Sequence, residues 1–177
     1  MRRPRPRRPR SVSAAPPSTP TELAARLRRL LLALVLVGAA GLIAELALLE
    51  HWDDPWQWTP LVLLAAVLVV GGTLWWRPGR GALRLFRGLM SVCVIAGALG
   101  VYLHYRGNVE FELEREPTLT GLALLWEAVR GATPALAPGA LAQLGLLGLL
   151  YAFRHPLLTD PPPGRATDAT DHSGGFA

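Results

Sequence analysis

The chain has 177 residues but contains no lysine, only one cysteine and two methionines, and few aromatic residues. The lone cysteine, Cys93, lies in an apolar stretch, so the sequence excludes an intrachain disulfide, a CxxC redox pair and a cluster of thiolate metal ligands. All eighteen basic residues are arginine, which is typical of a GC-rich genome and indicates no mechanism. The sequence also lacks a Ser/His/Asp constellation, a glycine-rich phosphate loop and an HExxH metal motif. These absences favour a protein that is not an enzyme.

Charged residues are nearly absent from four apolar stretches, at about residues 30–49, 60–76, 88–105 and 134–153. Hydrophobic residues make up 51% of the chain and the mean hydropathy is +0.29, while the charges are segregated between the apolar stretches. About twenty helical residues, at about 1.5 Å each, cross a hydrocarbon core of about 30 Å. The sequence therefore predicts an all-α membrane protein, in which residues 20–155 form one domain of four transmembrane helices.

The two ends of the chain differ from this domain in composition. In residues 1–19, prolines alternate with arginines as far as Arg10 and small residues follow, and residues 156–177 are rich in proline, glycine and polar residues, so we expect two disordered tails. The first helix should begin at Pro20, because Thr19 and Glu22 have the spacing of a capping box.

The distribution of arginine predicts the orientation of the chain. Nine arginines lie in residues 1–29, four lie between Arg77 and Arg87, and two follow the fourth stretch, whereas the first and third connections together have three. By the positive-inside rule, both termini are expected in the cytoplasm of a bacterium, with the chain multi-pass in the inner membrane. A net charge of +5 is also typical of proteins that bind nucleic acid. Because the arginines flank apolar stretches, they favour the lipid bilayer as the partner instead.

The connection between the third and fourth stretches, residues 106–133, is the most varied part of the sequence. Over six positions, three apolar residues alternate with three acidic ones: Val109, Phe111 and Leu113 with Glu110, Glu112 and Glu114. This period of two predicts a short extended segment. From about Thr118 to Arg130 the apolar spacing becomes helical, which predicts an amphipathic helix at the outer membrane interface. Together they should form an outer cap, either a rigid seal over the helix ends or a surface for a partner.

Eight polar residues are candidates for a functional role: Glu45, His51, Asp53, Asp54, His104, Glu110, Glu112 and Glu127. A carboxylate inside an apolar helix, as at Glu45, is a functional hypothesis by default, and the plainer alternative is an interfacial carboxylate paired with Arg106 or His104. His51 and His104 could ligate haem or, with nearby carboxylates, a divalent metal. Neither histidine has a recognisable ligand spacing, so we expect interfacial anchors and no metal or other cofactor.

The residues leave two classes of function open. The first is a non-enzymatic membrane subunit, assembly factor or scaffold that contacts a protein partner, or a second copy of itself, through its outer face. The second is a small oligomeric transporter or channel, which the polar content of the spans disfavours because Glu45 and Gln143 are their only clearly polar interior side chains. A haem- or metal-binding membrane protein is a remote third alternative.

Three stretches of the second half of the chain carry a resemblance: HYRGNVEFELE (104–114), GATPALAPG (131–139) and GLLGLLYAFRHP (145–156). They resemble stretches of small bacterial multi-pass membrane proteins, a four-helix family with no assigned activity. The resemblance covers about residues 100–156 and implies a bacterial cell membrane, without implying a reaction or a partner.

Overall fold

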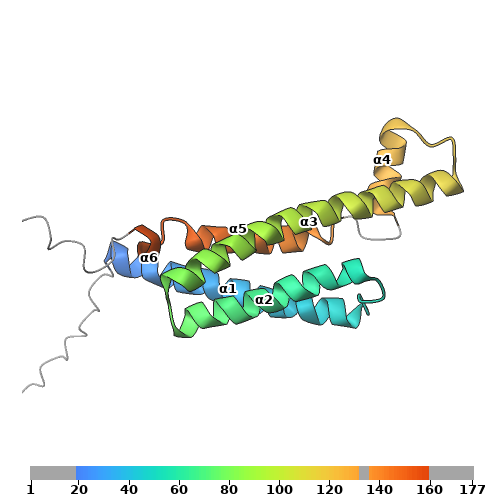
Figure 1. Ribbon diagram of the computed structural model, residues 1–177. Coiled ribbons are helices and arrows are strands. Elements are labelled where there is room, and N and C mark those ends of the chain that lie inside the picture. The colour runs from blue at the N-terminus through green and yellow to red at the C-terminus, as the bar shows by residue number, and fades with distance from the viewer. Residues whose placement is uncertain (1–18, 132–135, 160–177) are drawn as a thin grey trace, which may run out of the picture.

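The computed structural model describes residues 19–131 and 136–159, which are helical and contain no strand. The helices are α1 (Pro20–Leu48), the short 3-10 helix η1 (Pro55–Gln57), α2 (Trp58–Trp76), α3 (Arg80–Arg115), α4 (Gly121–Arg130), α5 (Gly139–Ala152) and α6 (Pro156–Thr159). Figure 1 shows α1, α2, α3 and α5 lying side by side, and each of the pairs α1–α2, α2–α3, α3–α5 and α5–α1 is in contact. The four helices therefore surround a shared core.

Three helical segments are long and apolar enough to cross a membrane: Pro20–Leu48, Pro55–Trp76 and Arg80–Arg115. They indicate a membrane protein, in agreement with the sequence prediction. The helix of the fourth apolar stretch is shorter, because α5 has 14 residues and rises about 21 Å, against a hydrocarbon core of about 30 Å. Residues 134 and 135 of that stretch lie outside the described part, and a turn over residues 136–138 precedes α5.

The start of α1 confirms the predicted capping box. The Thr19 hydroxyl oxygen accepts a hydrogen bond from the backbone N–H of Glu22 at 3.3 Å, and the Glu22 carboxylate accepts one from the Thr19 N–H at 3.1 Å. The predicted tails lie outside the described residues except at their inner edges. There, Thr19 belongs to the α1 cap and residues 156–159 form α6, so the C-terminal tail was predicted to begin too early.

The packing of α3 against α5 depends on glycine. A Cβ atom at Gly97 would lie 2.5 Å from the backbone N of Ala142, and one at Gly145 would lie 2.7 Å from the Met90 carbonyl oxygen. The two backbones can approach this closely only because these positions carry no side chain, as is common between membrane helices.

The core contrasts with an apolar outer surface. The largest fully buried side chains come from α1, α2 and α3: Phe86, Leu64, Leu83, Met90, Val35, Val67 and Cys93. Large apolar side chains are also exposed along the outward faces of the same helices, among them Leu34, Val37, Val69, Ile95 and Leu99. A soluble monomer rarely exposes so continuous an apolar surface, whereas lipid would cover it.

The extended segment predicted at residues 109–114 is wrong, because these residues continue α3 to Arg115. The alternation of acidic and apolar residues is compatible with a helix, since glutamate and leucine are good helix formers. An isolated extended segment would also leave its backbone without a strand partner in this helical chain. The third helix therefore has 36 residues and rises about 54 Å, far more than a hydrocarbon core requires.

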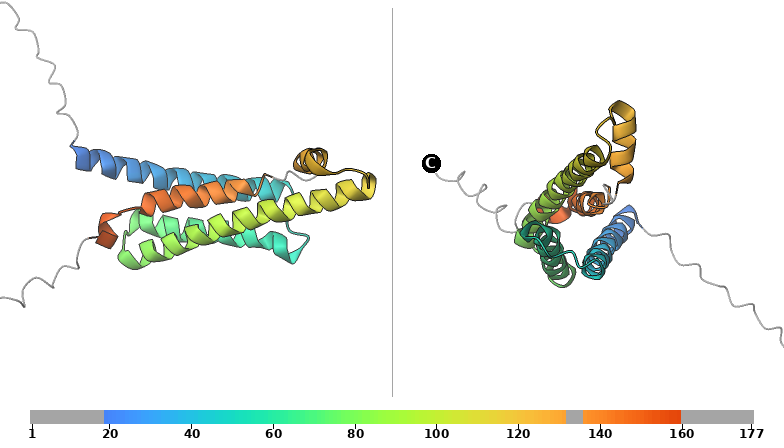
Figure 2. Two further views of the ribbon diagram at one scale, coloured as in Figure 1. Left: turned by 90° about the horizontal axis from the view of Figure 1, so that it is seen from above. Right: turned by 90° about the vertical axis from the view of Figure 1, so that its right-hand side faces the viewer.

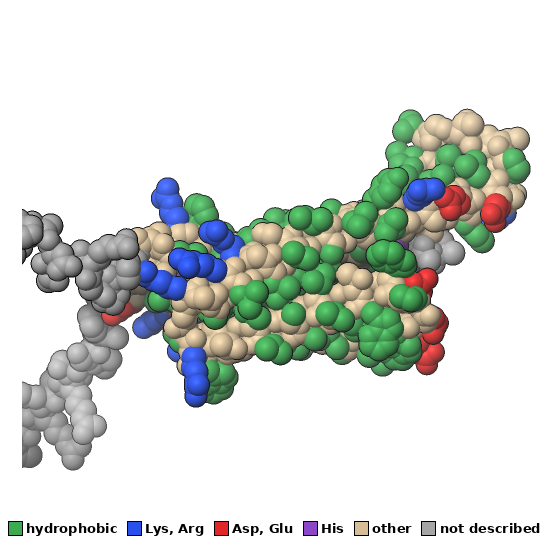
Figure 3. All heavy atoms as spheres, in the orientation of Figure 1, with side chains coloured by type: hydrophobic (Ala, Val, Ile, Leu, Met, Phe, Trp, Pro, Cys, Tyr) green, Lys and Arg blue, Asp and Glu red, His purple; other side chains and the backbone are tan. Residues whose placement is uncertain are grey.

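Charge divides the molecule by its two ends. The start of α1, the start of α3 and the end of α5 share one end, which we call the arginine-rich end, and the projecting end of α3 lies opposite (Figures 1 and 2). On the face drawn in Figure 3, arginine side chains gather at the arginine-rich end and most acidic side chains gather at the other. The helices thus collect arginines that the sequence spreads over three connections.

Candidate functional site

The most distinctive part of the structure is an arm formed by residues 104–115 of α3 together with α4. Figure 1 shows α3 projecting beyond the α1–α2 hairpin and carrying α4 on its projecting part. The helix α4 confirms the amphipathic helix that the sequence predicts, and it packs mainly on α3. The arm therefore stands away from the bundle instead of lying flat over the helix ends.

One buried hydrogen bond joins the two helices of the arm. Asn108 on α3 is 3% exposed, and its side-chain Nδ2 donates to the carbonyl oxygen of Ala128 on α4 at 2.9 Å. Gly131 lies against the same side chain, since a Cβ atom there would be 2.7 Å from Asn108 Cγ. The fully buried Ala128 and this glycine let α4 approach α3 closely enough for the bond to form.

A charged pocket lies beside this contact. It has a volume of about 400 Å³ and is lined by Phe111, Glu112, Arg115, Glu127, Arg130 and Gly131. Glu112 is 3% exposed, and its Oε2 lies 3.0 Å from Nη2 of the exposed Arg115. The lining residues include two carboxylates and two guanidinium groups, so this pocket has no strong preference for either charge.

The arm exposes an apolar surface around this pocket. On α4, Leu122 is 83% exposed and Trp126 is 60% exposed, and Leu125 and Phe111 are also exposed. Arg130 lies over the Trp126 ring at 5.6 Å, a cation–π contact that holds the indole on the surface. Large apolar side chains that are exposed together commonly mark a binding surface for protein or membrane.

The remaining candidate carboxylates have local or surface positions. Glu45 is exposed on α1, and Glu110 forms an exposed ion pair with Arg106 at 3.0 Å. Asp54 caps η1, because its Oδ1 accepts a hydrogen bond from the Trp56 N–H at 2.9 Å. The Asp53 N–H donates to Gln57 Oε1 at 2.9 Å in the same loop.

The candidate histidines occupy different elements. His51 is half-buried in the loop after α1, and His104 is half-buried on α3 where the arm begins. Within residues 19–131 and 136–159, no three histidine, cysteine, aspartate or glutamate side chains gather into a group that could hold a metal ion. The structure therefore does not bring the eight candidates together: Glu112 and Glu127 share the arm pocket, and the others lie apart from it.

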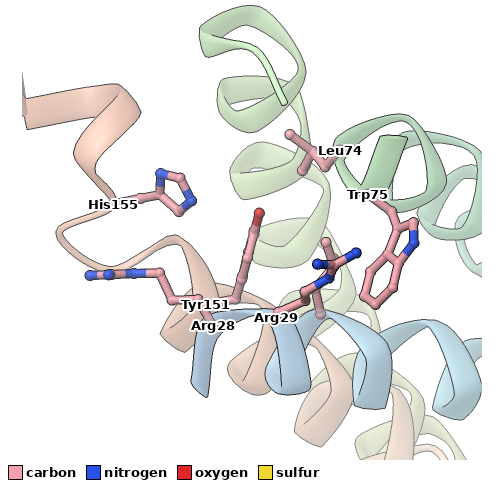
Figure 4. Close-up of a pocket in the computed structure, with 7 residues that line it drawn as sticks. Arg28, Arg29, Leu74, Trp75, Tyr151 and His155 are labelled. Carbon is pink, nitrogen blue, oxygen red and sulfur yellow. The ribbon is translucent and has the colours of Figure 1, made fainter. Parts of the chain in front are cut away.

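A second pocket, which sequence reasoning missed, lies at the arginine-rich end. This basic pocket has a volume of about 160 Å³ and is lined by Arg28, Arg29, Leu32, Leu74, Trp75, Tyr151 and His155. Figure 4 shows Tyr151 between Arg28 and Arg29, with His155 on the Arg28 side of Tyr151 and Trp75 beyond Arg29. The predicted topology was the one sequence feature that pointed to this pocket. Arg28 and Arg29 precede the first apolar stretch, Tyr151 and His155 end the last, and both ends were predicted on one side of the membrane.

The polar side chains of the basic pocket are held by specific contacts. Arg28 Nη2 donates to the Arg154 carbonyl oxygen at 3.2 Å, and Arg29 lies 4.7 Å from the centroid of the Trp75 ring. Burial, and to a lesser degree the charge of Arg28, lower the pKa of His155 below its ordinary value of 6.5. His155 Nδ1 accepts a hydrogen bond from the Leu157 N–H at 3.3 Å, which requires that nitrogen to carry no proton.

Both pockets place arginine beside aromatic side chains, which can contact a ligand through charge and through apolar surface. Comparison of the chain with models of protein families, with curated proteins and with solved structures gives no match in any of the three.

Proposed function

We propose that this chain is a non-enzymatic, multi-pass protein of a bacterial inner membrane, which acts as a subunit, assembly factor or scaffold through its arm. The observation that carries the proposal is the apolar surface of α4, raised above the bundle on the projecting end of α3. A helix that served only to anchor the chain in lipid would not need an extension of about 15 Å beyond Tyr105.

The proposed topology has four spans, with both termini in the cytoplasm and the arm outside it. Support comes from the packing of α5 with α1 and α3 and from the separation of charge between the two ends. The turn that precedes α5 adds length to the fourth crossing, and a locally thinner bilayer would accommodate the remainder. A topology reporter that works only outside the cytoplasm should be active after Pro55 and Glu116 and inactive after Gly79 and Asp160.

The partner surface can be tested by photo-crosslinking in living cells. A photoreactive amino acid is placed at Leu122 or at Trp126, and the control is placed at Trp56, which is 82% exposed in the loop after α1. We expect discrete protein adducts from both arm positions and none of the same mass from Trp56. Adducts with lipid alone from the arm positions would contradict the proposal and would indicate an interfacial anchor.

A small oligomeric transporter or channel is the alternative that this experiment separates. Glu45 and Gln143 are both exposed on the surface of the single chain, so only several copies together could line a polar pathway with them. Adducts between two copies from positions beside Glu45 and Gln143, with none from the arm, would favour transport over the proposed function.

A further inference from the structure

The basic pocket lies where the ends of α2 and α5 meet the third turn of α1. Arg28 and Arg29 come from α1, Leu74 and Trp75 from the end of α2, and Tyr151 and His155 from the end of α5 and the turn after it. The apolar part of α1 begins just after Arg29, and the apolar part of α2 ends near Trp75. The pocket therefore lies at the level where a hydrocarbon core would meet the lipid headgroups. This end of the molecule also holds Arg80, Arg84 and Arg87, at the start of α3.

The charge of the pocket has no partner of opposite sign among the residues that form it. No carboxylate is among its described lining residues, and the ion pairs found in the described chain join other residues, Arg106 with Glu110 and Arg115 with Glu112. Two guanidinium groups beside a shared cavity repel each other. An anion bound in the cavity that both arginines line would be attracted by both charges.

The donors of the pocket are already positioned. The bond from Arg28 to the Arg154 carbonyl and the contact of Arg29 with Trp75 restrict both side chains, yet each guanidinium keeps further N–H donors. The Tyr151 side chain stands between the two arginines in Figure 4, and its ring packs edge-on against Phe86 with centroids 5.6 Å apart. A planar guanidinium fork matches the geometry of phosphate oxygens better than any other side chain does.

We propose that the basic pocket binds the phosphate group of an anionic phospholipid, with Arg28 and Arg29 as its charged donors and Tyr151 between them. A cavity of about 160 Å³ has room for about five water-sized groups, which suits a phosphate group of five heavy atoms. Leu32, Leu74 and Trp75 provide an apolar wall for the carbon atoms attached to it. Basic pockets between helices at the cytoplasmic side are a known means of headgroup recognition. Because this pocket and the arm lie at opposite ends of the molecule, either proposal can fail without the other.

The test uses the full chain purified in a mild detergent. Its thermal unfolding is followed during titration with phosphatidylglycerol, with phosphatidylethanolamine of the same acyl chains, and with inorganic phosphate. We expect phosphatidylglycerol to raise the midpoint at concentrations where phosphatidylethanolamine has no effect. The double variant Arg28→Gln/Arg29→Gln should weaken the apparent affinity for phosphatidylglycerol about tenfold or more.

The matched control is Arg84→Gln/Arg87→Gln, which removes the same charge from exposed positions on α3 outside the pocket. It should change the apparent affinity by about twofold or less. If Arg28→Gln/Arg29→Gln does not fold, Arg28→Lys/Arg29→Lys keeps the charge while losing the guanidinium fork, and it should still weaken binding severalfold. Tyr151→Phe, which preserves the packing on Phe86, should weaken it less.

Three outcomes decide between the sources of the phosphate. If the pocket variant and the control variant lose the same amount of apparent affinity for phosphatidylglycerol, the proposal is overturned, because lipid is then attracted to the basic surface in general. The absence of any shift with phosphatidylglycerol would also overturn it. Inorganic phosphate could also raise the unfolding midpoint as much as the lipid does, with the effect lost in the pocket variant. That result would support a phosphate site but would identify its ligand as a soluble phosphate compound instead of a lipid.

Discussion

Asn108 and Glu112 are the buried polar side chains in the part of the chain that the structure describes, and both lie on α3 in the arm. They are four residues apart, so they occupy the same face of the helix and both face α4. Asn108 is satisfied by the Ala128 carbonyl, and Glu112 is next to Arg115. A polar group is rarely buried without such partners, because its loss of hydration is costly. The arm is therefore a specifically packed unit.

Replacement of Asn108 by alanine should loosen the arm without affecting the bundle. The change leaves the buried Ala128 carbonyl without this donor, at a cost of about 1–3 kcal/mol to the docking of α4 on α3. Amide hydrogen exchange should become about tenfold faster in α4 and stay unchanged in α1 and α2. Glu110→Ala, which removes an exposed ion pair two residues from Asn108, is the control and should leave both rates within about twofold. Unchanged exchange in α4 of Asn108→Ala would show that the bond does not hold the arm.

His155 should make the stability of the folded chain depend on pH. Its pKa is lowered in the folded state by burial and by Arg28 on α1, and its ring also faces Tyr151 on α5 with centroids 5.3 Å apart. The unfolded chain therefore binds a proton at a higher pH than the folded chain, and stability falls as the pH falls below 6.5. Unfolding midpoints measured between about pH 7.5 and pH 5.5 should fall more steeply for the wild type than for His155→Gln. Equal slopes would mean that this histidine does not contribute.

At the scale of the elements, α3 organises the molecule. Its first half packs on α2, its middle packs on α5 through Gly97 and Gly145, and its last part carries α4. A single rigid helix thus connects the core of the bundle to the arm. The contact with α5 brings the two backbones close together, because neither glycine carries a side chain that would hold them apart.

The α3–α5 contact predicts opposite effects for alanine at two glycines of the same helix. Gly97→Ala would place a methyl group 2.5 Å from the Ala142 backbone N, so the helices must separate at a cost of about 1–3 kcal/mol. Gly88→Ala meets open space and should be neutral or stabilise the helix by up to about 1 kcal/mol. Thermal unfolding in mild detergent compares the two variants. A midpoint for Gly97→Ala as high as that for Gly88→Ala would show that the helices are not so closely packed.

For the whole molecule, the property that favours a position across a bilayer is the combination of an apolar middle section with charged ends. Arginines flank the bundle at one end, and acidic side chains with exposed tryptophans lie at the other. Tryptophan is enriched where helices leave the hydrocarbon core, and exposed tryptophans occur in the loop after α1. Between Arg87 and Arg106, α3 carries no arginine or carboxylate over about 27 Å, close to the thickness of a bilayer core.

Cysteine accessibility in intact cells can test this placement along α3. Cys93 is fully buried and is first replaced by alanine, so that new cysteines can be introduced one at a time. A membrane-impermeant thiol reagent added from outside should label cysteine at Glu110 or Glu114 and fail to label it at Ile95 or Leu99, whose side chains are exposed in the isolated chain but would face lipid. Labelling at Arg84 from outside would reverse the proposed orientation.

The sequence by itself determined which segments are apolar helices, where α1 begins and where the chain turns between α2 and α3. These features depend on local composition: Thr19, Pro20 and Glu22 form the cap among themselves, and the turn at Arg77–Gly79 needs only its own residues. The amphipathic helix near Thr118–Arg130 was recognisable for the same reason, because its apolar spacing lies within one element.

Only the tertiary structure decided the conformation of residues 109–114, the burial of Glu112 and the existence of the basic pocket. Six alternating residues fit a strand or a helix equally well, and the continuous α3 helix together with its contact to α4 selected the helix. Arg28 and His155 are 127 positions apart in the sequence, so no local pattern links them. They line one pocket because α1 and α5 pack side by side with Arg28 at the level where α5 ends, and that depends on glycine contacts and core packing across the whole bundle.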